Sequence, residues 1–159
     1  MSRKGITSKM YVNEGTYNSP TWTHIDIVGD LAVNPNWQES DATIRRSRVQ
    51  LADTTLLAIE VTGNIRSDTD DTGYQLLRDA YVAETVLDIM CLNGADDEDD
   101  SDGVRFDGKI FNWSEDQARG NVLYKSFNIK PCPSTNVPKH VVVTAGAPVF
   151  GDFGEQAGS

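Results

Sequence analysis

The segment Val61–Gly94, VTGNIRSDTDDTGYQLLRDAYVAETVLDIMCLNG, decides the fold, because it places a strand, a helix start, a second strand and a turn in succession. Apolar and polar residues alternate from Leu57 to Arg66, which predicts a strand with one buried and one solvated face. From Thr85 to Leu92 the residues are again β-branched and apolar, and the Asn93-Gly94 pair after them favours a tight turn. The pattern therefore predicts a helix between two strands.

The helix is expected to be short and amphipathic. Thr72 precedes Gln75 by three residues, which is the spacing of a capping box, so we expect the helix to begin there. Tyr74, Leu77 and Tyr81 then share one helical face. A helix of roughly ten residues is not stable alone in water. We therefore interpret these three as core residues that hold the helix on a sheet.

Length and composition fit one domain. The chain has 159 residues, and we assign 1–145 to a single β domain and 146–159 to a flexible Gly-rich tail. No apolar run approaches the ~20 residues that cross a bilayer, and no apolar signal core follows the first residues. These features predict a soluble protein that is made in a cytoplasm and has no membrane partner.

Further short strands are expected on both sides of the quoted segment, so the chain reads as mainly β with one helix. Pro131, Pro133 and Pro138 are expected to end the pairing of the hairpin that precedes them. The predicted strands are 8–13, 23–31, the hairpin of 104–113 with 121–130, and an edge strand at 141–143.

Two segments stand out as loops. Residues 34–54 show no clean period and include Arg45, Arg46 and Arg48, and a loop of this length in a compact domain usually has a function. We take it as a contact arm. The second is the acidic loop, 95–103, in which six of the seven residues from Asp96 to Asp102 are acidic.

The acidic loop holds much of the formal net charge of -10, which becomes -10 + 6 = -4 without it. A solvated hairpin tip is the simpler interpretation. Glu98, Asp100 and Asp102 match the first positions of a calcium loop, but Lys109 stands where a bidentate Glu is required. The sequence therefore predicts no metal site of that type, and adventitious cation binding stays open. The acidic balance also argues against ordinary DNA-backbone binding.

No catalytic constellation is recognisable. His24 and His140 are the only histidines and are expected in or beside strands, and the sequence has no nucleophile elbow, Walker loop or zinc-helix motif. Cys91 and Cys132 are expected to be free thiols, since no export signal accompanies them. We expect no enzyme activity, no catalytic residue and no cofactor.

Several short motifs between Ser8 and Pro131 carry a family resemblance through their order and spacing. They are Trp22 with Ile25, Asp26, Val28, Gly29 and Asp30; Asp41-Ala42-Thr43 with Arg45; Leu77-Arg78-Asp79-Ala80-Tyr81; Gly103 with Phe106; and Asn128-Ile129-Lys130-Pro131. In this order the chain resembles tail tube proteins, the major tail proteins of long-tailed, non-contractile bacteriophages.

The resemblance implies a tail-tube-like β-sandwich or small barrel with one flanking helix. It further implies six-fold rings whose inner strands join into one barrel around a channel for DNA, with acidic side chains lining that channel and long loops stacking the rings. The implied partners are copies of the chain itself, then a tape measure protein and a tail tip or terminator protein, with DNA present only transiently. The implied place is the virion tail, after assembly in the host cytoplasm.

The resemblance and the clustered cations together suggest an assembly interface in the contact arm. Its candidate residues are Asp41, Thr43, Arg45, Arg46 and Arg48. Other interpretations stay open: a tail completion protein, a capsid decoration domain, a contractile-type tube subunit, or a monomeric sandwich module that binds a cation on the acidic loop.

Overall fold

Nine antiparallel strands and one helix make up the part of the chain that the computed structural model describes, residues 8–41, 52–116 and 123–153. The elements in chain order are β1 Lys9–Asn13, β2 Trp22–His24, β3 Val28–Asp41, β4 Ala52–Arg66, α1 Thr72–Ala83, β5 Leu87–Leu92, β6 Asp102–Asp116, β7 Tyr124–Pro131, β8 Lys139–Thr144 and β9 Ala147–Asp152. The mainly β class with one helix that is expected from the sequence is confirmed.

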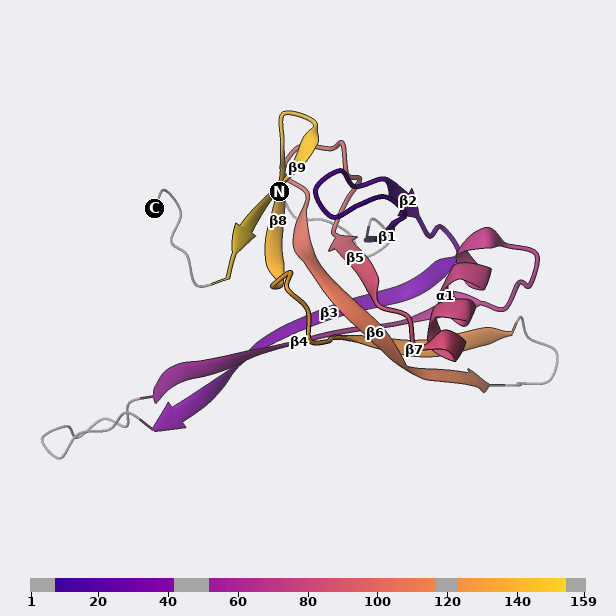
Figure 1. Ribbon diagram of the computed structural model, residues 1–159, viewed down its shortest axis with the longest axis horizontal. Helices are drawn as coiled ribbons and strands as arrows, with labels where there is room; N and C mark the ends of the chain where they lie inside the picture. Colours follow the sequence, from indigo (N-terminus) through magenta and orange to yellow (C-terminus); the bar gives the residue numbers. More distant parts are fainter. Residues whose placement is uncertain (1–7, 42–51, 117–122, 154–159) are drawn as a thin grey trace, which may run out of the picture.

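The long strand β6 connects the two parts of the sheet, whose order is β2-β1-β5-β6-β7-β4-β3. The first half of β6 pairs with β5 on one edge and with β8 on the other, and β8 pairs in turn with β9. The second half, from Gly108 to Asp116, pairs with β7. Figure 1 shows β6 crossing the molecule between these two groups of strands, with α1 beside the β6–β7 end.

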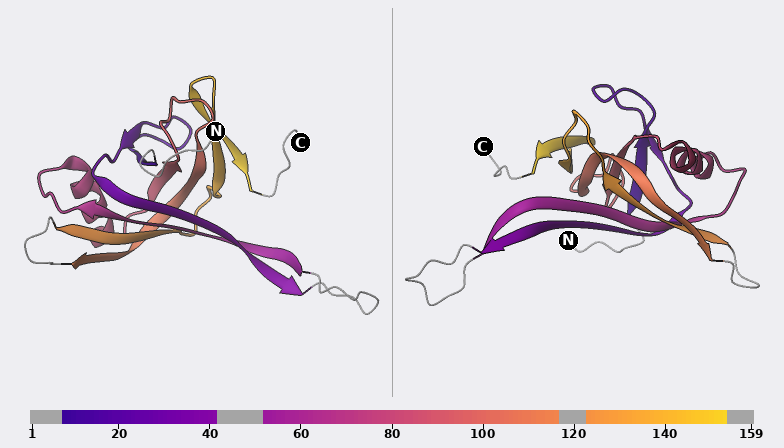
Figure 2. Two further views of the ribbon diagram at one scale, coloured as in Figure 1. Left: turned by 180° about the vertical axis from the view of Figure 1, so that it is seen from behind. Right: turned by 60° about the horizontal axis from the view of Figure 1, so that its bottom comes forward.

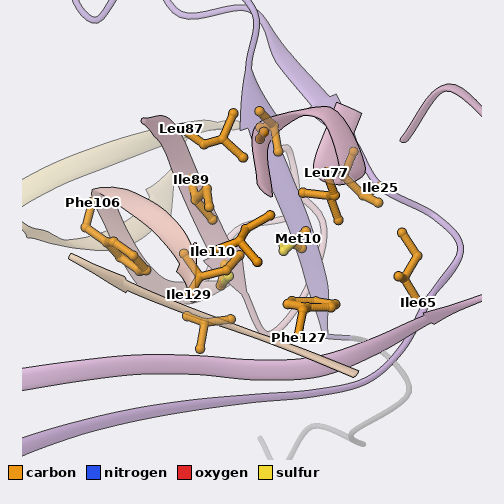
Figure 3. Packing of buried hydrophobic residues seen from close by; sticks show 14 of the residues in the cluster. Met10, Ile25, Ile65, Leu77, Leu87, Ile89, Phe106, Ile110, Phe127 and Ile129 are labelled. Carbon is orange, nitrogen blue, oxygen red and sulfur yellow. The ribbon is translucent and has the colours of Figure 1, made fainter. Parts of the chain in front are cut away.

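The main core lies between the two parts of the sheet and α1. Apolar side chains from β1, β5 and β6 face side chains from β4 and β7 (Figure 3). Phe106, Ile89 and Ile129 are each no more than 1% exposed. A second, smaller cluster around Tyr11 and Met90 lies apart from this core. The core is thus enclosed by two parts of one antiparallel sheet and by α1.

The helix begins where the sequence predicts, but its cap is one residue earlier. Asp71 is the N-cap, and its side chain accepts a hydrogen bond from the Tyr74 amide at 3.1 Å. Gln75 does not close a capping box with Thr72, because its side chain donates to the Thr69 carbonyl at 2.7 Å. A carboxylate one residue before the first turn satisfies the free amide equally well.

The core assignment of the helix needs one correction. Tyr74 is 3% exposed and Leu77 is fully buried, whereas Tyr81 is 37% exposed. The buried face is centred on Leu77 and Ala80, and Tyr81 lies about 100° around the helix from Ala80. Tyr81 instead stacks on Trp113 of β6 at the rim of the core, with 6.3 Å between ring centroids.

Two predicted strand boundaries were wrong near the N-terminus and in the contact arm. The stretch 23–31 is divided between β2 and β3, because residues 25–27 cross between the two parts of the sheet, where the Ile25 amide donates to the Met10 carbonyl. Residues 34–54 are not one long loop, since β3 continues to Asp41 and β4 begins at Ala52. The alternation of apolar and polar residues is not clear in this hairpin because the hairpin extends beyond the core, where strands do not need one apolar face.

The C-terminal segment is also more ordered than predicted. Ala147–Asp152 forms β9, which pairs along its length with β8, so only residues 154–159 of the expected tail lie outside the described residues. Ala145 and Gly146 have φ values of 54° and 77° and form the two-residue turn between β8 and β9. Phe153 then packs against the core.

The helix α1 has 12 residues, and within the described ranges no helix has the length and apolarity that a membrane crossing requires.

The cap gives a direct test of this local structure. Asp71→Ala removes the acceptor of the Tyr74 amide and should lower the free energy of unfolding by about 1 kcal/mol in urea titrations. Asp70→Ala removes the same charge from the neighbouring exposed position and should change the free energy of unfolding by less than about 0.5 kcal/mol. Equal effects of the two substitutions would contradict the capping role.

Candidate assembly surfaces

Four strands form a sheet with two free edges. In the order β6-β7-β4-β3, the second half of β6 ends the sheet on one side and β3 ends it on the other. Beyond Gly108, which pairs with Leu87, β6 has no partner other than β7 within the described residues. The fourteen residues of β3 pair only with β4 there. Each edge therefore presents backbone donors and acceptors that another strand can use.

One face of this sheet covers the core, and the opposite face, which we call the outer face, is polar. None of its described side chains is buried. Two rows of residues cross its centre and consist of amides, hydroxyls and one alanine. The first row contains Ala32, Thr62, Asn128 and Asn112, and the second contains Asn64, Ser126 and Ser114. Charged side chains lie toward the ends of the strands: Arg66 at one end, and Glu60, Lys109 and Lys130 at the other.

A shallow hollow of about 450 Å³ lies in the outer face. Asn128 donates its side-chain amide to Glu60 Oε1 at 3.2 Å. The carbonyl Oδ1 of Asn128 is buried and has no hydrogen-bond partner within the described residues. A water molecule or another polar group fits such a hollow, because a buried carbonyl without a hydrogen-bond partner is energetically unfavourable.

The contact arm is a two-stranded extension of the sheet. The last pair between β4 and β7 is Val61 with Ile129, and beyond it β3 and β4 continue together from Asn34 to Asp41 and from Ala52 to Glu60. Figure 2 shows this hairpin projecting from the body. Pro35 fits here because an edge strand tolerates the missing amide donor.

Of the predicted interface residues, only Asp41 is among the described residues. Asp41 is the last residue of β3 and its backbone is paired with Ala52. Thr43, Arg45, Arg46 and Arg48 lie outside the described residues. Their role in assembly stays a prediction.

The acidic loop connects β5 and β6 and is held to neighbouring elements by backbone groups. The Asp100 amide donates to the Val143 carbonyl, and the Val143 amide donates to the Ser101 carbonyl. The Gly146 amide donates to the Asp99 carboxylate at 2.9 Å. Across residues 8–41, 52–116 and 123–153, no group of three or more His, Cys, Asp or Glu side chains is placed to hold a metal ion. Asn93-Gly94 is the start of this longer loop and not a tight turn, since Leu92 pairs with Gly103.

A buried arginine that no sequence motif marks out contacts residues of three other strands. Arg105 of β6 is 3% exposed and binds both carboxylate oxygens of Asp88 of β5, at 3.0 and 2.6 Å. It also donates to the Tyr17 carbonyl at 2.9 Å. Its guanidinium lies 3.9 Å from the ring centroid of Tyr17, 4.6 Å from that of Phe150 and 4.9 Å from that of Trp22. Period-two patterning places Arg105 on a face but does not reveal these distant partners.

The cysteines and histidines have the surroundings of structural residues, since the Cys91 thiol is buried and each imidazole lies beside an aromatic ring. Cys91 and Cys132 are free, as predicted. Burial raises the pKa of the Cys91 thiol to about 12, which favours the protonated thiol at neutral pH. Burial is also the main cause that lowers the pKa of His24, whose ring lies 5.3 Å from that of Tyr11. The His140 ring meets Phe153 edge-on at 5.9 Å.

Comparison with solved structures shows that the chain has the fold of phage tail tube proteins. The SPP1 tail tube superposes with a TM-score of 0.66 at 11% identity, over 81% of this chain and 75% of that chain. The tail of an empty GTA particle with C6 symmetry gives 0.64 at 10% identity, over 84% and 96%. The virion of a native gene transfer agent (GTA) particle gives 0.63 at 10% identity, over 95% and 100%. No family model and no curated protein sequence matches the chain.

The role of Arg105 is testable with a conservative substitution. Arg105→Lys keeps the charge but loses the two-oxygen contact with Asp88, so the free energy of unfolding should fall by about 1.5–3 kcal/mol. Arg78→Lys is the matched control, because Arg78 is 39% exposed, its ion pair is with the adjacent Asp79, and its guanidinium lies 5.9 Å from the Tyr74 ring centroid. Its effect should stay below about 0.5 kcal/mol in the same denaturant titration. Equal losses for the two variants would contradict a structural role of the buried pair.

Proposed function

We propose that this protein is the self-assembling subunit of a phage tail tube, which forms stacked six-fold rings around a channel for DNA. The observation that carries the proposal is the four-stranded sheet with two free edges, β3 and the second half of β6, in a chain with the tail tube fold. The C6 symmetry of the similar GTA tail supports the number of subunits in a ring.

Ring closure follows from the two edges being different. When the β3 edge of one copy pairs with the β6 edge of the next, the contact is head to tail, and such contacts close into rings when the rotation permits. Each new pair satisfies backbone groups that would otherwise template uncontrolled association. The sheets of six copies then form one continuous barrel.

The outer face of the sheet is the surface that we assign to the channel. None of its described side chains is buried, and the residues that β4, β6 and β7 contribute to its central rows carry amides and hydroxyls. Its charged residues include the acid Glu60 and the bases Arg66, Lys109 and Lys130, and Asp116 ends β6 in the row of Tyr124 and Arg66. The acidic lining that the resemblance implies stays a prediction. A surface without a dense cation cluster still gives DNA few strong phosphate contacts.

The contact arm is the element that we assign to ring stacking. It extends two paired strands beyond the body, and the sequence between them includes Arg45, Arg46 and Arg48. The acidic loop on the body of another copy is a surface of complementary charge. Asp41 and Thr43 lie at the same end of the arm in sequence and are included in this proposed contact.

A tube subunit in the virion tail also needs partners at the ends and inside of the tube. The resemblance suggests a tape measure protein within the channel and a tip or terminator protein at the ends. Assembly in the host cytoplasm precedes passage of DNA. These partners belong to the proposal.

Assembly itself is the first test. The purified protein, concentrated and viewed by negative-stain electron microscopy, should form hollow filaments of stacked rings, and size-exclusion chromatography should show large species that increase with concentration. A chain that stays monomeric at every protein and salt concentration would overturn the proposed function.

The arm gives a sharper test. Arg45→Glu with Arg46→Glu should leave a folded protein, judged by circular dichroism, that forms no filaments, because the proposed contact with an acidic loop becomes repulsive. Arg45→Lys with Arg46→Lys keeps the charge and should still give filaments. Filaments of ordinary length from the Glu variant would exclude the arm from ring stacking.

A further inference from the structure

An apolar groove lies between the arm and the β8–β9 hairpin, along the β3 edge. It consists of two adjoining hollows of about 390 and 370 Å³, both of which Phe153 lines. From β3 the groove receives the core-side residues Leu31, Val33, Pro35 and Trp37, and from the opposite wall Val137, Pro138 and Val142. Trp37 is 40% exposed and Val137 is 55% exposed. The groove is therefore an apolar surface without a cover in the described structure.

A second apolar patch borders the other free edge of the same sheet. Val82 near the end of α1 is 75% exposed, and Val86 is 44% exposed. Val86 directly precedes the pair of Leu87 with Gly108, which is the last pair between β5 and β6 before the free stretch of β6 begins. Phe111, in the bulge of that free stretch, is 56% exposed. This patch and the groove thus lie at opposite edges of one four-stranded sheet.

Both surfaces are also on the same side of the sheet. Val33 and Trp37 pair with Val61 and Leu57 on the side that covers the core. The helix α1 packs on that same side, since Tyr74 and Tyr81 contact Trp113 of β6. Figure 1 shows α1 beside the β6–β7 end and the arm leaving at the opposite end.

We propose that the groove receives a second copy of this chain, specifically the Val82–Val86 segment at the end of α1 in the next subunit of the ring. The inference rests on the proposed function, because it uses the same head-to-tail order: where the β3 edge meets the neighbour's β6 edge, the neighbour's helix end arrives over the β3 groove. Two exposed apolar surfaces are then removed from water by one contact. The partner copy thereby completes a site that a single chain leaves open.

Assembly of charged variants tests the helix end. Val82→Asp with Val86→Asp should leave the unfolding transition close to that of the wild type, since both positions are exposed, but should raise the critical concentration for ring formation about ten-fold or more. Thr72→Asp adds a charge at the exposed first residue of the same helix and should leave the critical concentration unchanged. Unchanged assembly of the double variant would overturn the proposal.

Cross-linking tests which surface the helix end meets. In a Cys132→Ser background, Val82→Cys with Val137→Cys should give covalent ladders up to hexamers with a short bis-maleimide, while each single variant should give none. Wild-type rings seen by microscopy without such ladders would reject the groove contact and leave the tube function standing. If no rings form at any of the concentrations tested, both the groove contact and the tube function are rejected.

Discussion

The continuity of β6 is the constraint on which the rest of the structure depends. Its first half belongs to the group of β5 and β8, and its second half belongs to the four-stranded sheet with β7. Gly108 marks the change, where a side chain would lie 2.7 Å from the Phe106 ring and 2.8 Å from the Lys130 carbonyl. Because one strand spans both groups, the core between them and the free edge beyond Gly108 follow from the same backbone path.

The sequence predicted the parts of the fold whose signals are local. Alternation found the inner part of β4, and the polar run with its spacing located the start of α1. The arm was mistaken for a loop because polar residues such as Asn34 and Asn36 occupy a hairpin that leaves the core, so no clean apolar period survives there. β9 was missed because its pairing with β8 and the packing of Phe150 against the second cluster are tertiary contacts.

The candidate surfaces were less predictable than the fold. The sequence directed attention to charges: the acidic loop and the arginines after Asp41. The free edges follow only from knowing which strand lies last in the sheet, and the groove follows only from the position of β8 relative to β3. The pair of Arg105 with Asp88 spans seventeen positions and is visible only once β5 and β6 are in register. Long-range register is therefore the information that the sequence pattern lacked.

The distribution of charge and apolar surface fits the proposed association of copies. The acid excess is concentrated in a loop whose backbone is hydrogen-bonded to Val143 and whose Asp99 carboxylate accepts from the Gly146 amide, while the central-row residues of β4, β6 and β7 on the outer face are uncharged. Burial raises the pKa of the Cys91 thiol to about 12. Within the described residues, β3 and the second half of β6 leave backbone groups unpaired at the two edges of the four-stranded sheet, and exposed apolar side chains lie beside each of these edges. In the proposed head-to-tail contact both kinds of group would find partners at once, because each edge carries its own neighbouring patch. The proposed ring thus uses the same sheet that covers the core.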